Sequence, residues 1–538
     1  MNKPQIKYEY RSLEEGEHLY DGYDLNEDKE VKAEYIISSN PIHQGNPYIE
    51  ALPVARDRKA TEIAYQQPAA GYNRKAIENL NPFERMSAVK GIRKFRVQFA
   101  FHEQLEAHFN TLLKESYEER HVEVMKSGRI MLRGRNTDPT NEGLALLGLS
   151  GCGKTSAIAT LLSNYPQVIL HDFGEMDKRT QVVYLPVVVS TNSNFKALFR
   201  DLGIALDKAL GLDDHRYEKA ISKQSMSIGE KASLLTRWIE EFAIGIIIFD
   251  EIQQMDFSHT KENTFSTLMK IKNETKVAML FVGTDAAYEK FRNSDEDTNR
   301  RYGATISANI YCSDKKTFDA ICLKLFRYQY GYGNLIPTQE GIDALYEETQ
   351  GVIDHIICIY MFLQFEMIQN HYPDTTLTRK MVLHIGDKYF KGMRKVLKSK
   401  KDVLAQKDYV AIMENSRLLA EQMIAEAAQK AAGEKALTEV QDGIDIQKIK
   451  EEAINNIKVV AEMNGLLLED ENINTAVDAI MVQEKYQGAS SMQIARVALE
   501  KLNKQAPKSR TKMPKKRAKM DEKHKAWALE LQNTGDEI

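Results

Sequence analysis

Short apolar runs and helical stretches alternate between residues 143 and 311. The apolar runs lack the alternation of apolar and polar residues that marks a strand with one solvent-exposed face. The stretches between them carry apolar residues at helical spacing. Buried strands separated by helices are typical of a parallel sheet covered on both faces. We therefore predict an α/β domain with strands at LALLG, VVYLPVVVS, IGIIIFDE, VAMLFVGT and TISANIYC and helices at Ser156 to Leu162, Phe195 to Leu210 and Glu230 to Phe242.

Helical periodicity dominates the chain on either side of this domain. From Pro82, apolar residues recur at three- and four-residue steps through Ile92, Phe99 and Leu112, which predicts one amphipathic helix of roughly thirty residues. Residues 315–395 predict a small all-α lid. Ala- and Glu-rich sequence beyond Lys401 predicts further helices at Tyr409 to Ala432, Ile446 to Met463, Ile473 to Lys485 and Met492 to Leu502.

A glycine-rich motif follows the first apolar run. Residues 148–155 read GLSGCGKT and fit the phosphate-binding pattern GxxxxGK[ST], placed between a strand and a helix as that pattern requires. Its backbone N–H groups curl around phosphates, its lysine reaches the β and γ oxygens, and its hydroxyl binds Mg²⁺. We predict that Lys154 also serves catalysis and that ATP and Mg²⁺ bind at Gly148, Ser150, Gly151, Cys152, Gly153, Lys154, Thr155 and Ser156. The alternative is a glycine-rich turn that binds no nucleotide.

Two carboxylates end the apolar run at residues 246–249. Asp250 and Glu251 come at the carboxyl edge of a parallel sheet, where open sheets bind ligands. A carboxylate pair at the end of a buried strand is otherwise costly. We predict that Asp250 joins Thr155 at the Mg²⁺ ion and that Glu251 polarises the water that attacks the phosphate. The alternative is a pair that caps the next helix.

Three more residues are candidates for the same reaction. Thr284 ends the next apolar run and would orient water or the γ-phosphate, although a helix N-cap explains it equally well. Arg300 and Arg301 follow an acidic loop, and either would stabilise transition-state charge in a neighbouring subunit. That role would make oligomerisation the switch. The alternative for both arginines is a set of solvated ion pairs with the acidic loop.

Composition and charge exclude several classes of protein. The length of 538 residues predicts two or three folded units plus tails. With 43% hydrophobic and 28% charged residues, the composition is typical of a soluble globular protein and not of a disordered one. The chain has neither an apolar run near the roughly 18 residues of a membrane span nor a signal-peptide core, so we expect a cytoplasmic protein without a membrane partner. Cys152, Cys312, Cys322 and Cys358 form no CxxC pair, which predicts reduced, structural cysteines and no zinc site.

The order of P-loop, Asp-Glu strand, Thr-ended strand, arginine pair and helical lid resembles an AAA+ domain of the initiator-like branch. A narrower resemblance begins at residues 45–53, GNPYIEALP, which are similar to the GNPLIEALP-like segment ahead of the P-loop in the TnsC/TniB regulators of DNA transposition. It continues through SNFKALFRDLG, IIIFDEIQ and TQGVIDHI and covers roughly residues 40 to 395. The last third resembles the longer TnsC proteins more than the compact TniB forms.

The resemblance implies an AAA+ ATPase that oligomerises on double-stranded DNA as a hexameric or heptameric ring or as a helical filament. Such an ATPase obeys a TnsD/TniQ-like target-selection protein and recruits transposase and endonuclease subunits, and hydrolysis disassembles it. Where many AAA+ lids carry a sensor arginine in a GxxR turn, this chain has Gly351-Val-Ile-Asp354, which argues against ATP sensing by the lid and favours slow turnover. Competing hypotheses are a replication-initiator or helicase-loader ATPase and a nucleotide-binding scaffold without hydrolysis. The intact Glu251 argues against the scaffold.

Candidate DNA contacts also follow from the resemblance. The segments that face the pore in related rings carry Asn192, Ser193, Lys196, Lys270 and Lys272 here, although residues of these types are more often ordinary exposed side chains. The net charge of only -4 hides lysine-rich stretches at residues 391–401 and 508–519. Either stretch would offer sequence-independent phosphate contacts that weaken with salt.

These observations predict five segments. Residues 1–81 form an extended arm with a partner-binding segment, and residues 82–312 form the AAA+ α/β core, of the P-loop class, with its leading helix. Residues 313–400 form the helical lid, residues 401–503 a helical C-terminal region, and residues 504–538 a basic flexible tail.

Overall fold

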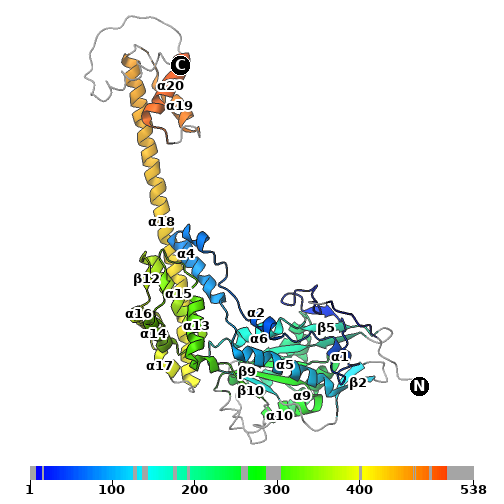
Figure 1. Cartoon of the computed structure of the whole chain (residues 1–538). Coiled ribbons are helices and arrows are strands. Elements are labelled where there is room, and N and C mark those ends of the chain that lie inside the picture. Colours follow the sequence, from blue (N-terminus) through cyan, green and yellow to red (C-terminus); the bar gives the residue numbers. More distant parts are fainter. Residues whose placement is uncertain are drawn as a thin grey trace. The chain divides into compact units, whose positions relative to one another are not determined.

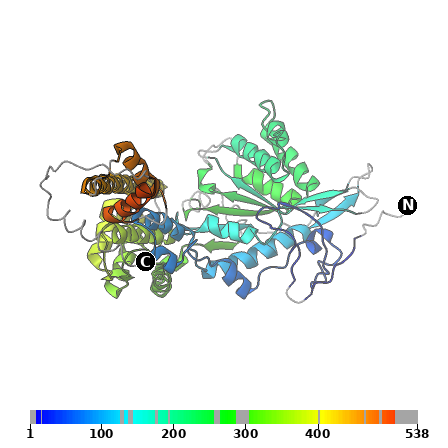
Figure 2. The same cartoon turned by 90° about the horizontal axis from the view of Figure 1, so that it is seen from above.

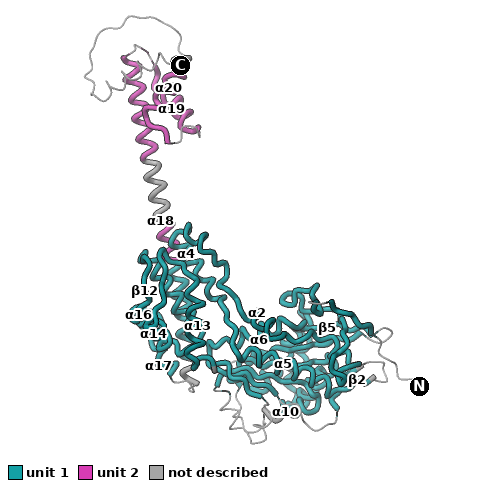
Figure 3. Tube along the Cα trace, in the orientation of Figure 1, with its two compact units in different colours: residues 1–424 teal, residues 425–538 magenta. Residues whose placement is uncertain are grey.

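The computed structural model describes residues 8–14, 17–124, 130–135, 143–173, 178–190, 194–255, 264–285, 287, 304–398, 403–463, 466, 468–483 and 488–505. The chain divides into two compact units, residues 1–424 and 425–538 (Figure 3). The division falls inside helix α18 (Val403–Met463). Unit 1 therefore contains the predicted α/β domain, its lid and the first part of the C-terminal helical region.

A five-stranded parallel sheet forms the centre of unit 1. Each neighbouring pair of strands is parallel. Every residue of the strands at 144–147 and 278–283 is buried, as expected for strands covered on both faces. The predicted parallel sheet is confirmed, in the order β10 (Ala304–Ser307), β4 (Leu144–Leu147), β9 (Ala278–Gly283), β8 (Ile246–Asp250) and β7 (Tyr184–Val188).

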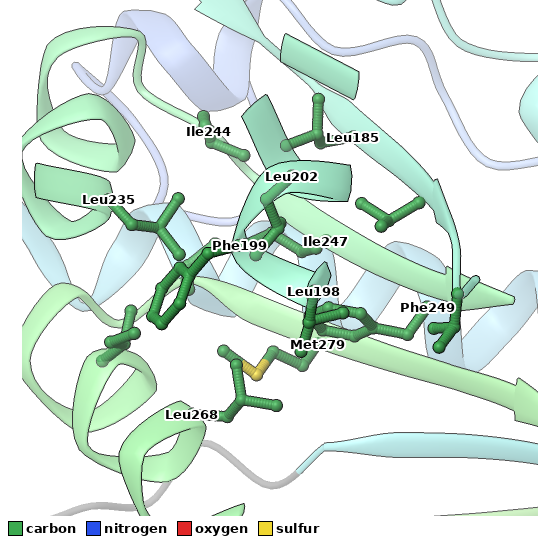
Figure 4. Close-up of a cluster of buried hydrophobic side chains, with 14 of the residues drawn as sticks. Leu185, Leu198, Phe199, Leu202, Leu235, Ile244, Ile247, Phe249, Leu268 and Met279 are labelled. Carbon is green, nitrogen blue, oxygen red and sulfur yellow. The ribbon is translucent and has the colours of Figure 1, made fainter. Parts of the chain in front are cut away.

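Three helices cover one face of this sheet, α7 (Phe195–Ala209), α9 (Ile228–Glu241) and α10 (Thr264–Thr275). Figure 4 shows Leu198, Phe199 and Leu202 of α7 packing with Leu235 and Leu268 over side chains of the strands. The strand residues that receive them are every second one, including Ile247, Phe249 and Met279. The short helix α8 (Arg216–Ile221) packs beside α7.

The opposite face is covered by α5 (Ala100–Glu118) and α6 (Lys154–Leu162) (Figure 2). The last turn of α5 is fixed to the start of β8 by hydrogen bonds. The Ser116 hydroxyl donates to the carbonyl of Gly245 at 2.8 Å, and the Tyr117 hydroxyl donates to the carbonyl of Ala243 at 3.0 Å. Both hydroxyls are buried, so these bonds satisfy groups that would otherwise be costly.

The predicted single helix from Pro82 is wrong. The chain forms α4 (Pro82–Val89), a 3₁₀ turn η1 (Lys90–Lys94), a non-helical stretch, and then α5. In that stretch Arg96 and Gln67 exchange backbone hydrogen bonds of 3.1 and 2.8 Å as an antiparallel bridge. Phe95 and Phe99 are buried all the same, which is why the apolar spacing runs unbroken across the interruption.

The N-terminal arm carries more regular structure than its composition suggests. Its helices are α1 (Pro47–Glu50), α2 (Arg58–Ala64) and α3 (Arg74–Glu78). The segment GNPYIEALP is buried at Tyr48, Ile49 and Leu52, and the Asn46 side chain donates to the carbonyl of Tyr117 at 3.2 Å. These contacts fix the arm to α5. The partner-binding role of the arm stays a prediction.

Two of the three smaller sheets among the described residues are formed by segments that precede the lid. Strand β1 (Glu30–Lys32) of the arm pairs in parallel with β5 (Val168–His171), which pairs antiparallel with β6 (Arg179–Val182). A hairpin follows α5, formed by β2 (Arg120–Val124) and β3 (Ile130–Gly134). The sequence analysis did not find these five strands, because each is short and they carry mixed polar residues.

The lid is helical, as predicted (Figure 1). Helix α15 (Ile353–Gln369) is buried along almost its whole length and forms the centre of the lid. A two-residue parallel pair, β11 (Leu335–Ile336) and β12 (Thr375–Thr376), joins two of the connections. The lid helices are α13 (Lys315–Leu325), α14 (Gln339–Thr349), α15 (Ile353–Gln369), α16 (Arg379–Tyr389) and α17 (Met393–Lys398), and α13 follows the 3₁₀ turn η3 (Ile310–Ser313).

The C-terminal region differs from its prediction in one respect. The two helices predicted at residues 409–432 and 446–463 are one continuous helix, α18. The residues between them are mostly good helix formers, and each of the two glycines there costs only about 1 kcal/mol. In unit 2, α18 shares a small apolar core with α19 (Asp470–Met481) and α20 (Ser491–Gln505). The predicted tail lies almost wholly outside the described residues.

Among the helices that the structure describes, none combines the length and the apolar character that crossing a membrane requires.

The close packing of α5 against the start of β8 predicts that one added methyl group at Gly245 lowers stability. A Cβ added at Gly245 would lie 2.5 Å from the Tyr117 hydroxyl and 2.6 Å from Leu113 Cδ1, so Gly245→Ala should destabilise unit 1 by about 1–3 kcal/mol. At Gly229 in α9 an added Cβ meets nothing within 4 Å, and Gly229→Ala should leave stability unchanged or raise it by up to about 1 kcal/mol.

Urea unfolding followed by the fluorescence of Trp238, which lies in the core of unit 1, measures both changes in a Trp527→Phe background. Equal midpoints for the two variants would contradict the packing described for α5.

Candidate nucleotide-binding site

Residues 148–153 form a loop that joins β4 to α6. Gly151 and Gly153 have φ of +82° and +91°, a region that glycine adopts without strain. The N–H of Gly148 donates to the carbonyl of Gly283 at 3.2 Å, which ties the loop to the end of β9. Because the first amides of α6 have no carbonyl partner within the helix, the loop offers a cradle of N–H groups suited to phosphate.

Lys154 is the first residue of α6 and is buried. Its ammonium group donates to the carbonyls of Gly148 at 2.8 Å and Leu149 at 2.9 Å. Burial lowers the pKa of Lys154, and the nearby carboxylates Glu251 and Asp250 oppose that shift. The cation is therefore held inside the loop and close to the two acids.

The acid pair lies at the carboxyl end of β8. Asp250 is the last residue of β8, and the Thr155 side chain is near enough to help lower the pKa of its carboxyl group. Burial raises the pKa of Asp250, and the backbone N–H of Glu251, the charge of Lys154 and the Thr155 side chain oppose the increase. Hydroxyl and carboxylate oxygens are the ligands that Mg²⁺ prefers, so the residues at this position fit the ion.

Glu251 has a left-handed backbone, with φ of +58°, which is uncommon for a residue that carries a side chain. Its N–H donates to Asp250 Oδ1 at 2.8 Å. The pKa of Glu251 is raised, first by loss of water around its carboxylate and then by the charge of Asp250. Strained backbone and a raised carboxyl pKa together are typical of a functional position.

Gln253, in the 3₁₀ turn η2 (Ile252–Gln254), links this acid to the neighbouring strand. Its amide donates to Glu251 Oε2, and its Oε1 accepts a hydrogen bond of 3.1 Å from the N–H of Thr284. Thr284 is 3% exposed, and its hydroxyl has no hydrogen-bond partner among the described residues. A buried hydroxyl without a partner is costly, which points to a role in binding water or substrate rather than in capping.

A cavity of about 470 Å³ lies over the loop. Four separate parts of unit 1 line it, and charged groups are concentrated in its wall. They are the loop itself with Glu251, the turn at Arg93, Phe95 and Arg96, the lid residues Ile353, Asp354 and Ile357, and the first turns of α18 at Tyr409, Val410, Met413, Glu414 and Arg417. A smaller aromatic hollow adjoins it, lined by Tyr65, Val97, Phe99 and His102.

A sequence-family profile described as AAA domain matches residues 139–291, which span the strands β4 to β9 and carry the loop and the acid pair. The core has the AAA+ fold.

Two solved structures resemble the chain more weakly. Cdc6p from Pyrobaculum aerophilum shares 17% identity over 43% of this chain and 58% of its own, with a TM-score of 0.30. The Orc1 protein of Aeropyrum pernix, in complex with DNA, shares 13% identity over 46% of this chain and 59% of its own, with a TM-score of 0.29. The chain thus spans less than two thirds of either protein. No curated protein sequence matches it.

The remaining predicted residues of the AAA+ domain fall into three groups. Arg300, Arg301, Asn192 and Ser193 lie outside the described residues. The side chains of Lys196 and Lys270 are exposed, the second beside Glu274 at 3.7 Å. Lys272 is only 3% exposed and therefore forms no part of the surface that would meet DNA in this structure. The arginine-finger and DNA-binding roles stay predictions.

The four cysteines form no disulfide in the described part of the chain, and all are buried. Cys152 of the loop lies next to Cys312, with 3.9 Å between the two sulfur atoms. That contact lowers the pKa of Cys152. The sequence analysis predicted separate cysteines with a structural role, and the proximity of these two depends on η3 packing under the loop.

Several residues at the site of the AAA+ domain were missed from the sequence. Gln253 could have been predicted from its spacing, because a residue only two positions after Glu251 remains at the same edge of the sheet. Tyr409, Met413 and Arg417 recur at four-residue steps, but nothing in that spacing shows which surface the helix covers. Arg93 and Arg96 were assigned to a helix that the structure interrupts.

The unpartnered hydroxyl of Thr284 yields a prediction that separates a catalytic from a structural role. Thr284→Val replaces the hydroxyl with a methyl group of similar size, and because no hydrogen bond is lost, stability should change by less than about 0.5 kcal/mol. If the hydroxyl orients water or phosphate, ATP hydrolysis should fall at least about tenfold.

Thr275→Val is the matched control, because the Thr275 hydroxyl is buried but donates to the carbonyl of Ile271 at 2.7 Å and accepts from Val277. This variant should lose about 1–3 kcal/mol and keep its rate of hydrolysis per folded molecule. Phosphate release and urea unfolding measure the two quantities, and unchanged hydrolysis by Thr284→Val would exclude the catalytic role.

Proposed function

We propose that this chain is an ATPase whose site is the cavity between the glycine-rich loop, the acid pair and the lid. The observation that carries the proposal is that Lys154, Thr155 and Glu251 line one cavity, with Asp250 next to Glu251 at the end of β8. Phosphoryl transfer requires a cation at the phosphates, a metal-binding pair and a group that positions water, and these four residues provide each of them.

The phosphates would bind at the loop. Two hydrogen bonds of the Lys154 ammonium group go to loop carbonyls, and its remaining N–H is free for a β or γ oxygen. Thr155 and Asp250 would hold Mg²⁺, which would neutralise charge on the same oxygens. Burial of Lys154 strengthens its attraction to phosphate, because fewer water molecules compete.

Glu251 would accept a proton from the attacking water. Its raised pKa makes the carboxylate a better base than an exposed glutamate, and it must be ionised to act. The hydrogen bond from Gln253 fixes the orientation of the carboxylate and connects it to the backbone of Thr284. The Thr284 hydroxyl would then be the second group that positions the water or the γ-phosphate.

The base of the nucleotide would occupy the apolar end of the cavity. Phe95, Ile353 and Ile357 line that end, and the neighbouring hollow adds Phe99 and Val97. Apolar and aromatic side chains such as these suit an aromatic ring. The segment at residues 95–99 reaches this position only because the helix is interrupted there.

We further propose that the ATPase regulates DNA transposition. The support is the ordered resemblance at residues 45–53, 193–203, 246–253 and 349–356 to TnsC/TniB regulators. In this role ATP stabilises an oligomer, a ring or a filament, on double-stranded DNA, because it binds assembled subunits more tightly than free ones. The oligomer joins a target-selection protein to the transposase and endonuclease subunits, Arg300 or Arg301 acts across subunits, and hydrolysis drives disassembly.

Two substitutions test this proposal. Lys154→Ala should weaken ATP binding at least tenfold and abolish ATP-dependent binding to duplex DNA of random sequence, because it removes a buried charge at the phosphates. Glu251→Gln should retain ATP and lower hydrolysis by roughly 10²–10⁴-fold, so its DNA complex should persist. Lys208→Ala, an exposed lysine of α7, should match the wild type.

Nucleotide titration, phosphate release and gel mobility shift measure the three properties. DNA complexes that form without regard to ATP, or that survive in Lys154→Ala, would exclude an ATP-controlled assembly. Tight binding confined to one duplex sequence would favour a replication initiator instead.

A further inference from the structure

One wall of the nucleotide cavity comes from α18, more than two hundred residues after the loop in the sequence. Tyr409, Met413 and Arg417 recur at four-residue steps, so they lie on one face of the helix, and that face lines the cavity. Tyr409 is 5% exposed, and its hydroxyl would lie 2.1 Å from a Cβ placed on Gly151. The helix therefore rests directly on the loop.

The lid turn presents a carboxylate to the same cavity. The N–H of Asp354 donates to the carbonyl of Gly151 at 3.2 Å, which fixes the residue beside the loop. An anion at this position repels a bound triphosphate unless a cation offsets it. Three arginines do so, in the order Arg417, Arg93 and Arg96, and they oppose the increase in the pKa of Asp354 that burial causes.

Arg417 differs from Arg96 in its freedom to move. Its Nη2 lies 3.5 Å from Asp354 Oδ2, at the long limit of a hydrogen bond, and its side chain is 50% exposed. Such a pair is weak. Arg96 instead donates to the carbonyls of Arg93 and Phe95 at 2.7 and 2.8 Å, so its guanidinium group is committed to its own turn.

We propose that Arg417 binds the terminal phosphate of ATP and that Asp354 holds Arg417 when that phosphate is absent. A guanidinium group can form two short, charge-assisted hydrogen bonds to a phosphate, which are stronger than its present contact with Asp354. ADP lacks the terminal phosphate and leaves the pair intact. Arg417 thus makes the site prefer ATP over ADP, and the C-terminal helix supplies the arginine that the lid turn lacks.

This inference rests on the proposed ATP site, and the test compares two nucleotides in one titration. The dissociation constants of a non-hydrolysable ATP analogue and of ADP are measured with Mg²⁺ for the full chain. Arg417→Gln should weaken binding of the analogue at least about tenfold and binding of ADP by less than about twofold. Arg417→Lys, which keeps the charge but loses the paired donors, should fall between Arg417→Gln and the wild type.

Glu421→Gln is the matched control. Glu421 lies one turn further along α18 and pairs with Lys90 at 2.5 Å, outside the cavity. Its loss should leave the affinities for both nucleotides unchanged. The unfolding midpoint reported by Trp238 shows whether each variant is folded, and the half-exposed position of Arg417 predicts no change.

Asp354→Asn supplies the converse test. Removing the competing carboxylate should tighten binding of the ATP analogue, and this gain should be smaller in the double variant with Arg417→Gln, where only direct repulsion between Asp354 and the phosphates is relieved. A gain as large in the double variant as in Asp354→Asn alone would mean that Asp354 does not act through Arg417, which would overturn the proposal.

Three further results would overturn it. In the first, Arg417→Gln weakens binding of both nucleotides equally. In the second, it weakens binding of neither. In the third, Arg93→Gln selectively weakens binding of the ATP analogue and Arg417→Gln does not. Failure of the ATPase proposal looks different, because then the wild type binds neither nucleotide, or Lys154→Ala binds both as well as the wild type does.

Discussion

The attraction between one buried lysine, Lys154, and the two carboxylates Asp250 and Glu251 is the interaction on which the site depends. Lys154 begins α6 and Asp250 and Glu251 end β8, so the parallel sheet alone brings the opposite charges together. Burial lowers the pKa of the lysine and raises the pKa of each acid, and each charge opposes the shift of the other. A triphosphate with its metal ion is the ligand that would complete this set of charges.

The rest of unit 1 keeps this arrangement in place. Helices on both faces of the sheet exclude water from the strands, and Gly148 and Gly283 connect the loop to the central strand β9. The lid joins through the bond between Asp354 and Gly151, and Tyr409 of α18 rests on the same glycine. Segments that are distant in the sequence therefore meet at Gly151 of the glycine-rich loop. A change in what the loop binds will affect all of them.

The sequence predicted the sheet, its covering helices and the positions of the glycine-rich loop and the acid pair at strand ends, because each depends on local pattern. Fully buried strands are continuous apolar runs, and the glycine-rich motif is defined by contiguous residues. The break at residues 95–99 was missed because Phe95 and Phe99 are buried from an extended backbone and keep the spacing of a helix. The contacts of Tyr409 and Arg417 with the cavity depend on how the chain folds back, which periodicity does not specify.

The most direct test of the central claim is an electron cryomicroscopy map of the full chain with duplex DNA, Mg²⁺ and a non-hydrolysable ATP analogue. The account predicts density for a triphosphate and a metal ion between residues 148–155 and the pair Asp250 and Glu251, in subunits assembled around the duplex. An empty cavity at saturating nucleotide, or nucleotide bound elsewhere on the chain, would contradict it.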